Sequence, residues 1–595
     1  MRMSRWFIAR LLSWFVLCAG GTPALAAPDV RTPFAVTPAA AMPGAFTVLC
    51  YHEVRRDVRD FADPFAVDSA ALVAQFAWLR ENSFVPVRLG DIIAARSGGK
   101  PLPAKAVLLS FDDAYLSFYT DVYPLLREFG FPAVLGVVGR WIDQPDDGSV
   151  QYGEKGTFTN ARFPSWSQLR EVAGSGLVEI ASHTYDLHRG VAANPQGNLQ
   201  PAATTRIYDA ATGRYEDDAD WRARVRADLA RSAAVIERET GHRPRAIVWP
   251  YGSYNDELVR IAAELGMPVA LTLNDGTNTP AVPLAAVRRT LIQHNPSLGE
   301  FTTEQRGPLY AVPVRVVQVN LDEVHHPDAV QQERNLSMLL ERIAVLKPTH
   351  VVLQAISDVA GAQAGSYFPS RHLPLRADLL NRAAWQLASR AGVKVFVVLP
   401  LAGFRLTQEQ VIDVYEDLAR HANIDGLLFM QGRTPEPPDE ADTARFLAAT
   451  QAQADAAQRW RAPLKIARGL LIDSPGTQRM QAALAPQVAA LAGRSDYVVI
   501  ASYPVQGAAV DPAMLATRVS SVLSSGQQAV WSKLIYVLVN HVGTGRPTGT
   551  LMARQMREWQ LGGAINFGYS GDDFLHDAPP LADIAPAMSL RIFPR

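Results

Sequence analysis

The chain has 595 residues, which is too many for a single ordinary hydrophobic core, so we expect two or three domains. Its composition is that of a globular protein, with 48% hydrophobic and 19% charged residues. The 57 basic residues almost balance the 58 acidic ones and leave a net charge of −1, which argues against nucleic acid as a principal partner.

The first 26 residues have the pattern of a secretory signal peptide. Arginines precede a short apolar stretch at 11–19, and small residues at 24 and 26 match a cleavage site. The stretch is too short to span a membrane, so we expect an exported, periplasmic protein without a transmembrane helix in the mature chain. A lipoprotein modified at Cys18 is the alternative, and the bulky Leu17 disfavours it. Residues 27–44, rich in Ala, Pro and Thr, are expected to form a flexible lead-in.

From residue 45 to residue 294, short apolar runs alternate with helical patterns. The predicted strands are 47–51, 107–109, 133–138, 178–181, 246–249, 269–272 and 291–292. The predicted helices include 70–80, 119–129 and 166–173, and Ser165 with Gln168 makes a capping box for the last of them. Six or seven strands with intervening helices predict an irregular, incomplete β/α barrel. The polar stretch 194–220 reads as a surface insertion with a small hairpin near 207–215.

Two motifs stand directly after predicted strands. Asp112 and Asp113 follow 107–109, and His183 and His188 follow 178–181. Active sites of α/β proteins gather at the carboxyl ends of strands. An aspartate and two histidines can hold a metal ion and the second aspartate can act as a base, which is the minimum for metal-assisted hydrolysis. Taken alone, each motif also fits a turn or a helix cap.

The spacing of the two histidines restricts how they can meet. Five residues correspond to about 140° around a helix, so both rings cannot face one ion from a single helix. We therefore expect His183 to end the strand and a turn to bring His188 back toward it.

A second alternation follows a linker at 295–313. Its predicted strands are 314–321, 350–356, 393–399, 426–430, 464–472, 497–502, 534–540 and 564–568. Helical patterns such as 379–391 and 445–460 separate them. Eight strand–helix steps over 314–595 predict a complete (β/α)8, TIM-like barrel.

The first half resembles the polysaccharide deacetylases, that is, the family-four carbohydrate esterases. Residues 110–115 are similar to the first motif of that family, 182–188 to its second with one extra residue, and 249–252 to its third. The extra residue, the early stretch 51–54 and the second barrel are similar, more narrowly, to two-domain poly-β-1,6-N-acetyl-D-glucosamine N-deacetylases of bacterial biofilm systems. In the second half, 317–322 and 367–378 carry this resemblance.

The resemblance implies one divalent ion, with Asp113, His183 and His188 as its ligands. Zn²⁺ is expected, and Ni²⁺ or Co²⁺ is compatible with the same ligands. The family resemblance makes Asp112 the general base for the attacking water, and the backbone N–H of Tyr115 a donor to the developing oxyanion.

The leaving amine needs a proton, and a histidine suits this role near neutral pH. His52 matches the narrower family and is preferred, while His294 matches the usual order of motifs.

Further residues are candidates for binding the sugar chain. Trp249, Pro250 and Tyr251 can wall a groove, although a core role for Trp249 is nearly as compatible with its position. Asp186 can orient a metal ligand or cap the turn. In the second barrel, Asp322 is expected to bind cationic glucosamine units.

The expected function is N-deacetylation of poly-β-1,6-N-acetyl-D-glucosamine during export, with an outer-membrane porin as a further partner. The second barrel is expected to bind the partly deacetylated polymer. Cleavage should be weak or absent, because Met430-Gln431-Gly432 stands where hydrolytic relatives carry an acidic pair and the loop 402–407 is short. Asp473, Asp572 and Asp573 end other strands without an assigned role. The alternatives are a deacetylase for chitin-like or peptidoglycan sugars, an endoglycosidase, and a non-catalytic polysaccharide-binding export factor.

Overall fold

A computed structural model of the whole chain describes residues 42–588, apart from 59–62, 146–147, 153–155, 306–312, 358–363, 435–438, 473–477, 505–510, 524–529 and 541–547. The predicted signal peptide and Asp473 lie outside the described residues, as does most of the predicted lead-in. The described residues all belong to one compact unit by their contacts. None of the described helices is both long enough and apolar enough to cross a membrane.

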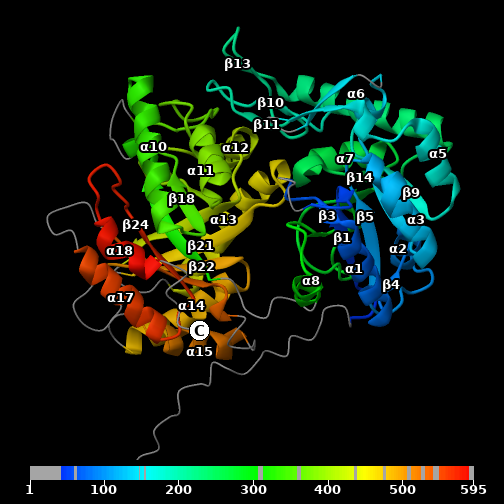
Figure 1. Cartoon of the computed structure of the whole chain (residues 1–595). Coiled ribbons are helices and arrows are strands. Elements are labelled where there is room, and N and C mark those ends of the chain that lie inside the picture. Colours follow the sequence, from blue (N-terminus) through cyan, green and yellow to red (C-terminus); the bar gives the residue numbers. More distant parts are fainter. Residues whose placement is uncertain are drawn as a thin grey trace, which may run out of the picture. The chain divides into compact units, whose positions relative to one another are not determined.

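The first half is built on a parallel sheet whose strands follow the order β15-β14-β9-β6-β5-β1-β16, with β4 also pairing with β5 (Figure 1). The strands are β1 (Phe46–Tyr51), β4 (Val85–Pro86), β5 (Ala106–Phe111), β6 (Ala133–Val137), β9 (Val178–Ser182), β14 (Ala246–Val248), β15 (Val269–Leu271) and β16 (Thr290–Leu291). All six residues of β5 are buried, as expected for a strand covered on both faces. The path does not close on itself, so the prediction of an incomplete β/α barrel is confirmed.

Helices connect these strands. They are α1 (Ser69–Glu81), α2 (Leu89–Arg96), α3 (Tyr123–Phe129), α4 (Gly139–Ile142), α5 (Trp166–Gly174), α6 (Asp218–Thr240) and α7 (Asp256–Glu264). The predicted capping box at the start of α5 is present, with Ser165 and Gln168 each accepting from the backbone of the other. The predicted helix at 119–129 begins as a π-helical segment, η2 (Phe118–Val122), and continues as α3.

The insertion between β9 and α6 consists of two small hairpins. The first pairs β10 (Gly190–Ala192) with β11 (Leu199–Pro201), and the second pairs β12 (Tyr208–Asp209) with β13 (Arg214–Tyr215). The second hairpin is the one that the sequence predicts. Asp217 then caps α6 by accepting hydrogen bonds from two backbone N–H groups of its first turn.

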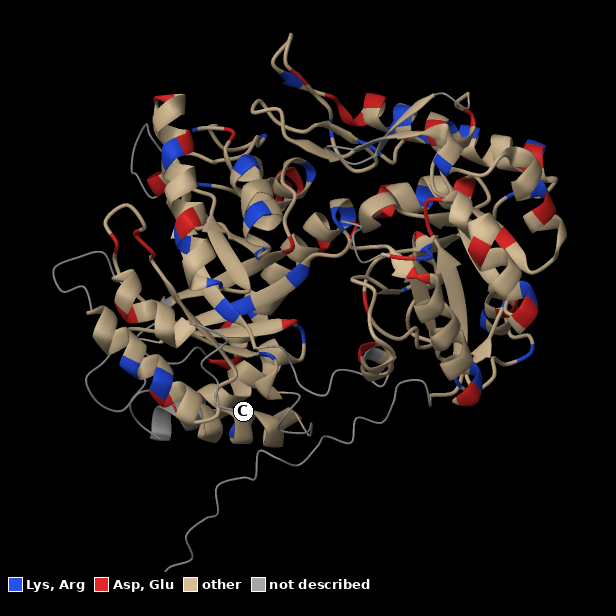
Figure 2. Ribbon diagram, in the orientation of Figure 1, with Lys and Arg blue, Asp and Glu red and all other residues tan. Residues whose placement is uncertain are grey.

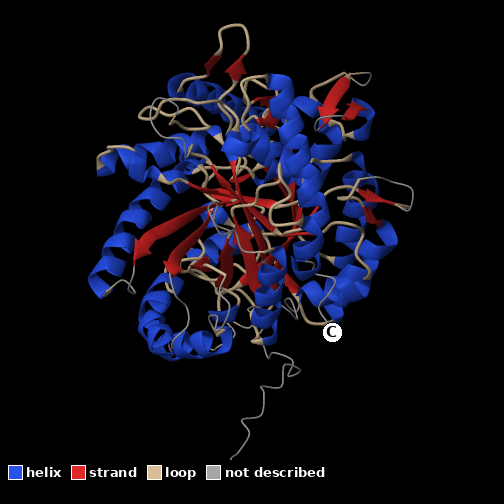
Figure 3. Cartoon of the chain, turned by 90° about the vertical axis from the view of Figure 1, so that its left-hand side faces the viewer, coloured by secondary structure: helices blue, strands red, loops and turns tan. Residues whose placement is uncertain are grey.

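The second half is a closed barrel of parallel strands surrounded by helices, as Figure 3 shows. Its strands are β17 (Arg315–Asn320), β18 (His350–Gln354), β19 (Lys394–Val398), β20 (Gly426–Thr434), β21 (Lys465–Ile472), β22 (Tyr497–Ser502), β23 (Leu534–Val539) and β24 (Asn566–Ser570). The outer helices include α10 (Ala329–Leu346), α11 (Leu380–Ala391), α12 (Gln408–His421), α13 (Glu440–Trp460), α14 (Gln478–Ala492), α15 (Pro512–Leu523), α17 (Gly549–Leu561) and α18 (Leu581–Met588). The predicted TIM-like barrel is therefore confirmed. Basic and acidic residues are interspersed over both sets of helices (Figure 2).

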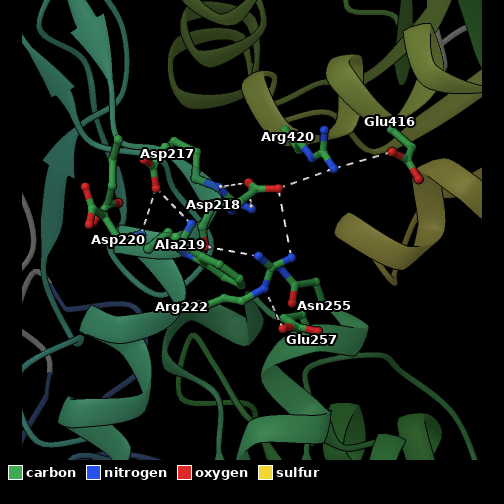
Figure 4. A network of polar contacts seen from close by, with 12 residues as sticks. Asp217, Asp218, Ala219, Asp220, Arg222, Asn255, Glu257, Glu416 and Arg420 are labelled. Carbon is green, nitrogen blue, oxygen red and sulfur yellow. Dashed lines mark hydrogen bonds and ion pairs between the residues drawn. The ribbon is translucent and has the colours of Figure 1, made fainter.

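A polar cluster around Asp218 links α6 to α12 (Figure 4). The carboxylate of Asp218 lies 2.8 Å from Nη2 of Arg206 and 3.4 Å from Nη2 of Arg420. Arg206 is buried, and this burial lowers the pKa of its guanidinium to about 10. A buried cation of this kind depends on its carboxylate partner.

Candidate active site

The backbone of the sheet holds both motifs at its carboxyl edge. The N–H of Asp112 donates to the carbonyl of Tyr51 at 2.9 Å, which extends the pairing of β1 with β5 by one residue. The N–H of His183 donates in the same way to the carbonyl of Val137 at 2.9 Å, beyond the pairing of β6 with β9. The aspartates and the first histidine therefore leave the same edge of one parallel sheet.

Asp113, His183 and His188 converge in the buried interior of this edge. Oδ1 of Asp113 lies 3.3 Å from Nε2 of His183 and 3.2 Å from Nε2 of His188. Ligands about 2.0–2.1 Å from a tetrahedral ion are separated by about 3.3 Å, so these three atoms already have the spacing of a zinc site. The three residues form one of the two described groups that could hold a metal ion.

Hydrogen bonding prepares His183 for this role. Its Nδ1 donates to the carbonyl of Val248 at 2.8 Å, which orients the ring so that Nε2 faces Asp113. Burial raises the pKa of the Asp113 carboxyl, but the neighbouring His188 and His183 lower it by more. The pKa of Asp113 therefore lies well below its usual range. Asp113 is therefore ionised and ready to bind a cation.

The loop from His183 to His188 is held in place by α6. The carboxylate of Asp228 accepts one hydrogen bond from the N–H of Tyr185 at 2.9 Å and another from the N–H of Asp186 at 2.7 Å. One turn further along α6, Oγ of Ser232 lies 2.7 Å from Oγ of Ser182. These contacts explain how a spacing of five residues brings both imidazoles to one point, as the sequence predicts.

Backbone strain occurs in each of the three motifs. Positive φ angles occur at Asp113 (70°), Ala114 (51°), Thr184 (70°) and Tyr251 (58°), none of which is glycine. Such conformations cost free energy and persist where the surrounding structure enforces them, often at functional sites.

Asp112 lies beside the three converging residues and has a separate set of partners. Its Oδ1 accepts a hydrogen bond from Nη1 of Arg289 at 2.7 Å, and its Oδ2 faces Sγ of Cys50 at 3.5 Å. Burial raises the pKa of the Asp112 carboxyl, but the Arg289 guanidinium, together with His183 and His52, outweighs burial and holds this pKa below its usual value. Cys50, His52 and Asp112 form the second described group of potential ligand atoms, all within 4.8 Å of one another. His52, the preferred acid, is thus adjacent to the predicted base.

The third motif divides between the core and the surface. Tyr251 is 43% exposed, and its ring centroid lies 4.6 Å from that of His188, so it borders the site. Trp249 has no exposed surface and Pro250 is buried. The expectation that Trp249 walls a sugar groove is therefore wrong, because the residue at the end of β14 points into the core instead. The ring of Tyr115 is also buried and stacks on Phe163.

Asp186 and His294, the other two candidate residues of the first half, make contacts outside the group of Asp113, His183 and His188. The carboxylate of Asp186 pairs with Arg140 and Arg189, both at 3.4 Å. His294 is exposed, and its backbone N–H donates to the carbonyl of Pro64. Neither belongs to the described groups of potential metal ligands.

Two residues that sequence reasoning missed are Arg289 and Asp228. Each is far in sequence from the side chain or loop that it holds: Arg289 is 177 positions from Asp112. No local pattern marks either residue, since an arginine beside a short strand and an aspartate in a long helix are common on protein surfaces.

In the second barrel, Asp322 follows β17 and accepts a hydrogen bond from Oη of Tyr367. Asp572 is fully buried against Arg342, and Asp573 pairs with His576, so both serve local contacts. Met430, Gln431 and Gly432 lie within β20, which continues to Thr434, and no carboxylate stands among these three described positions.

Comparisons with known proteins find a matching family model in each half of the chain. Residues 99–270 match the family described as polysaccharide deacetylase, and 318–412 match the one described as hypothetical glycosyl hydrolase family 13. The chain is 31% identical to the poly-beta-1,6-N-acetyl-D-glucosamine N-deacetylase of Escherichia coli (strain K12), over 92% of this chain and 93% of that protein.

Two solved structures from Bordetella bronchiseptica are also similar. The BpsB deacetylase domain is 47% identical, with a TM-score of 0.39 over 42% of this chain and 96% of that one. The PgaB (BpsB) glycoside hydrolase domain is 25% identical, with a TM-score of 0.39 over 47% of this chain and 99% of that one.

Proposed function

Since the chain belongs to the family of poly-β-1,6-N-acetyl-D-glucosamine N-deacetylases, we propose that it removes acetyl groups from this polymer by hydrolysis of the amide bond. The observation that carries the proposal is the convergence of Asp113, His183 and His188 at the spacing of a metal site, with Asp112 beside them. A binding protein without catalysis would have no use for an ionised carboxylate pair buried at the end of a sheet.

Asp113, His183 and His188 are the residues that would hold the ion, and their mixed oxygen and nitrogen donors favour Zn²⁺, with Ni²⁺ and Co²⁺ as alternatives. A divalent ion bound there would polarise the amide carbonyl and acidify the attacking water. The hydrogen bond from Nδ1 of His183 to the carbonyl of Val248 orients the ring so that Nε2 is the nitrogen directed at the ion.

Asp112 acts as the general base. Arg289 binds Oδ1 and keeps the carboxylate ionised despite its burial, which leaves Oδ2 to accept the proton of the attacking water. We assign His52 as the acid that donates a proton to the leaving amine, because a nitrogen of its ring lies within 4.8 Å of the Asp112 carboxylate and so borders the site. The backbone N–H of Tyr115 is assigned to the oxyanion.

We assign the chain's organisation in the same proposal. Residues 1–26 are a signal peptide, 27–44 a lead-in, 45–294 the deacetylase domain, 295–313 a linker and 314–595 the second barrel. The protein would work in the periplasm and pass the modified polymer to an outer-membrane porin. Asp322 in the second barrel would bind the amines that deacetylation creates.

We propose that the second barrel binds polymer without cleaving it at an appreciable rate. Glycoside hydrolysis uses two carboxyl groups flanking the bond, and β20 carries Met430, Gln431 and Gly432 where an acidic pair would be needed. Partly deacetylated oligomers incubated with the full chain should gain no new reducing ends. A steady increase in reducing ends that persists in the Asp112→Asn variant would overturn this assignment.

Acetate release from β-1,6-linked N-acetylglucosamine oligomers tests the proposed reaction, with β-1,4-linked oligomers run in parallel. Release confined to the β-1,6 series and lost in Asp112→Asn supports it. Release from the β-1,4 series alone keeps the chemistry and points to chitin-like or peptidoglycan sugars. No release by a folded, metal-loaded chain would favour a non-catalytic polysaccharide-binding export factor.

A further inference from the structure

Cys50 and His52 lie on the same side of the chain at the end of β1, beside Asp112. Successive side chains of an extended strand alternate between its two faces, so residues two positions apart share a face. β1 pairs in parallel with β5, and Cys50 lies beside Ser110 in this pairing. The N–H of Asp112 continues the pairing by donating to the carbonyl of Tyr51. One potential ligand atom from each of Cys50, His52 and Asp112 therefore lies within 4.8 Å of the other two.

Two of these atoms already have the separation of ligands that share one ion. Sγ of Cys50 lies 3.5 Å from Oδ2 of Asp112, at the distance of a thiol–carboxylate hydrogen bond. A sulfur about 2.3 Å and an oxygen about 2.0 Å from a tetrahedral Zn²⁺ are also about 3.5 Å apart. An ion can therefore take the place of the thiol proton with little movement of either side chain. The imidazole of His52 is only partly buried, so a turn about its side-chain bonds can bring a ring nitrogen to the same ion.

The burial of these side chains matches that of the first site. Cys50 is 0% and Asp112 is 3% exposed, whereas the exposed fractions of Asp113, His183 and His188 are 1%, 2% and 6%. Ligand atoms close directly around an ion at about 2.0–2.3 Å, so neither site requires a space the size of a water molecule before the ion arrives. The partly exposed His52 provides a route for the ion from solvent.

The chemistry of this group makes it selective and weaker than the first site. A thiol, an imidazole and a carboxylate are ligands for Zn²⁺ or Co²⁺, and the sulfur disfavours Mg²⁺ and Ca²⁺. Burial raises the pKa of the Cys50 thiol well above its usual value, so an ion has to displace the thiol proton. The Arg289 guanidinium, 2.7 Å from Oδ1 of Asp112, repels a second cation, and so does an ion in the first site. We expect the second ion to bind at least about 100-fold more weakly than the first.

We propose that Cys50, His52 and Asp112 form an inhibitory metal site, which binds Zn²⁺ or Co²⁺ when either ion is in excess. As the metal–sulfur bond forms, the thiol proton passes to water, and nothing is oxidised or reduced. The ion occupies Oδ2 of Asp112 and a ring nitrogen of His52. Asp112 can then accept no proton from the attacking water, and His52 can donate none to the leaving amine. The site itself stands on the geometry of the three side chains, and its inhibitory effect rests on the proposed deacetylase activity.

Titration of the metal-stripped full chain with Co²⁺ tests the proposal, in a Cys18→Ser background that leaves Cys50 as the only cysteine. We expect acetate release to reach its maximum at one equivalent, without thiolate-to-cobalt charge-transfer absorption. That absorption should appear only in excess Co²⁺, and acetate release should fall in parallel by at least tenfold. Cys50→Ser should show neither the absorption nor the fall. Ser110→Ala, equally buried on the paired strand, is the matched control and should show both.

Absence of the absorption in saturating Co²⁺, or its appearance with the first equivalent, would overturn the second site. Equal inhibition of Cys50→Ser and Ser110→Ala by excess Co²⁺ would overturn its inhibitory role. If Cys50→Ser does not fold, X-ray absorption spectra of the Cys18→Ser chain with Zn²⁺ decide instead, because a sulfur ligand should be seen in excess Zn²⁺ and not at one equivalent. A chain that releases no acetate at one equivalent would refute the deacetylase proposal, whereas the absorption still decides whether the second site exists.

Discussion

Replacement of Arg289 by methionine isolates the group that keeps the proposed base ionised. The side chains of Arg289 and Asp112 are 0% and 3% exposed, and Nη1 lies 2.7 Å from Oδ1. Methionine retains much of the side-chain volume but leaves the Asp112 carboxylate buried without its cation. Arg288→Met is the matched control, because Arg288 is the neighbouring arginine and is exposed.

Removing one partner of a buried ion pair costs about 3–5 kcal/mol, and we expect Arg289→Met to lose this much unfolding free energy at pH 7. At 1.36 kcal/mol per pKa unit, the same change would raise the pKa of Asp112 by about 2–4 units at most. The acid limb of the rate–pH profile should therefore move upward. Adding Asp112→Asn should recover part of the lost stability, because the uncompensated charge is then gone.

The dependence of stability on pH should also change sign for this group. In the native protein the pKa of Asp112 is lowered, so its contribution to stability is present above the unfolded-state pKa and is lost as pH falls through the folded-state pKa. In Arg289→Met the folded-state pKa lies above the unfolded one, and this residue then favours folding more at lower pH. Urea unfolding from about pH 3 to pH 8 measures the stability, because the native contribution is lost only below the unfolded-state pKa of about 3.9, and acetate-release profiles measure the activity. If Arg289→Met matched Arg288→Met in both, the reasoning would be refuted.

Four further substitutions separate the roles of individual aspartates. Asp113→Asn should weaken Zn²⁺ binding by more than about 100-fold. Asp112→Asn should retain Zn²⁺ and lose about 10²–10⁴-fold in the rate of acetate release. Equal Zn²⁺ affinities of the two variants in a chelator competition would contradict the assignment. Asp228→Ala should weaken Zn²⁺ binding about 10–100-fold, because it releases the loop from His183 to His188. Asp220→Ala, on the exposed face of the same helix, is the control and should not weaken Zn²⁺ binding. Equal Zn²⁺ affinities of the two variants would exclude a positioning role for Asp228. Asp218→Asn leaves the buried guanidinium of Arg206 without its carboxylate and should lower the free energy of unfolding by about 2–3 kcal/mol. Its thermal midpoint should therefore be lower than that of the exposed control Asp220→Asn. Identical midpoints would show that the Asp218–Arg206 pair contributes little to stability.

The sequence predicted the elements whose signal is local. Each strand of the second barrel is a continuous apolar run bounded by helical patterns, so their number and order could be read before the structure was known. β4 (Val85–Pro86) escaped detection because two residues carry no periodicity. The length of α6 was not predicted, since the polar insertion before it obscures the pattern.

The candidate site divides in the same way. Asp112, Asp113, His183 and His188 could be selected because each pair stands at the end of an apolar run. Their supports could not, because Arg289 and Asp228 reach the site only through tertiary folding. Trp249 illustrates a different limit: an aromatic residue at the end of a strand fits a groove or a core equally well, and only its burial decides between them.

Titration of chelator-stripped protein with Zn²⁺, followed by acetate release from β-1,6-linked N-acetylglucosamine oligomers, tests the central claim most directly. The account predicts no release by the stripped protein and a linear recovery of activity that saturates at one equivalent of Zn²⁺ per chain. It also predicts that Asp113→Asn recovers nothing over the same range. Full activity in the stripped protein, or recovery by Asp113→Asn that matches the native chain, would contradict a metal-dependent deacetylase built on Asp113, His183 and His188.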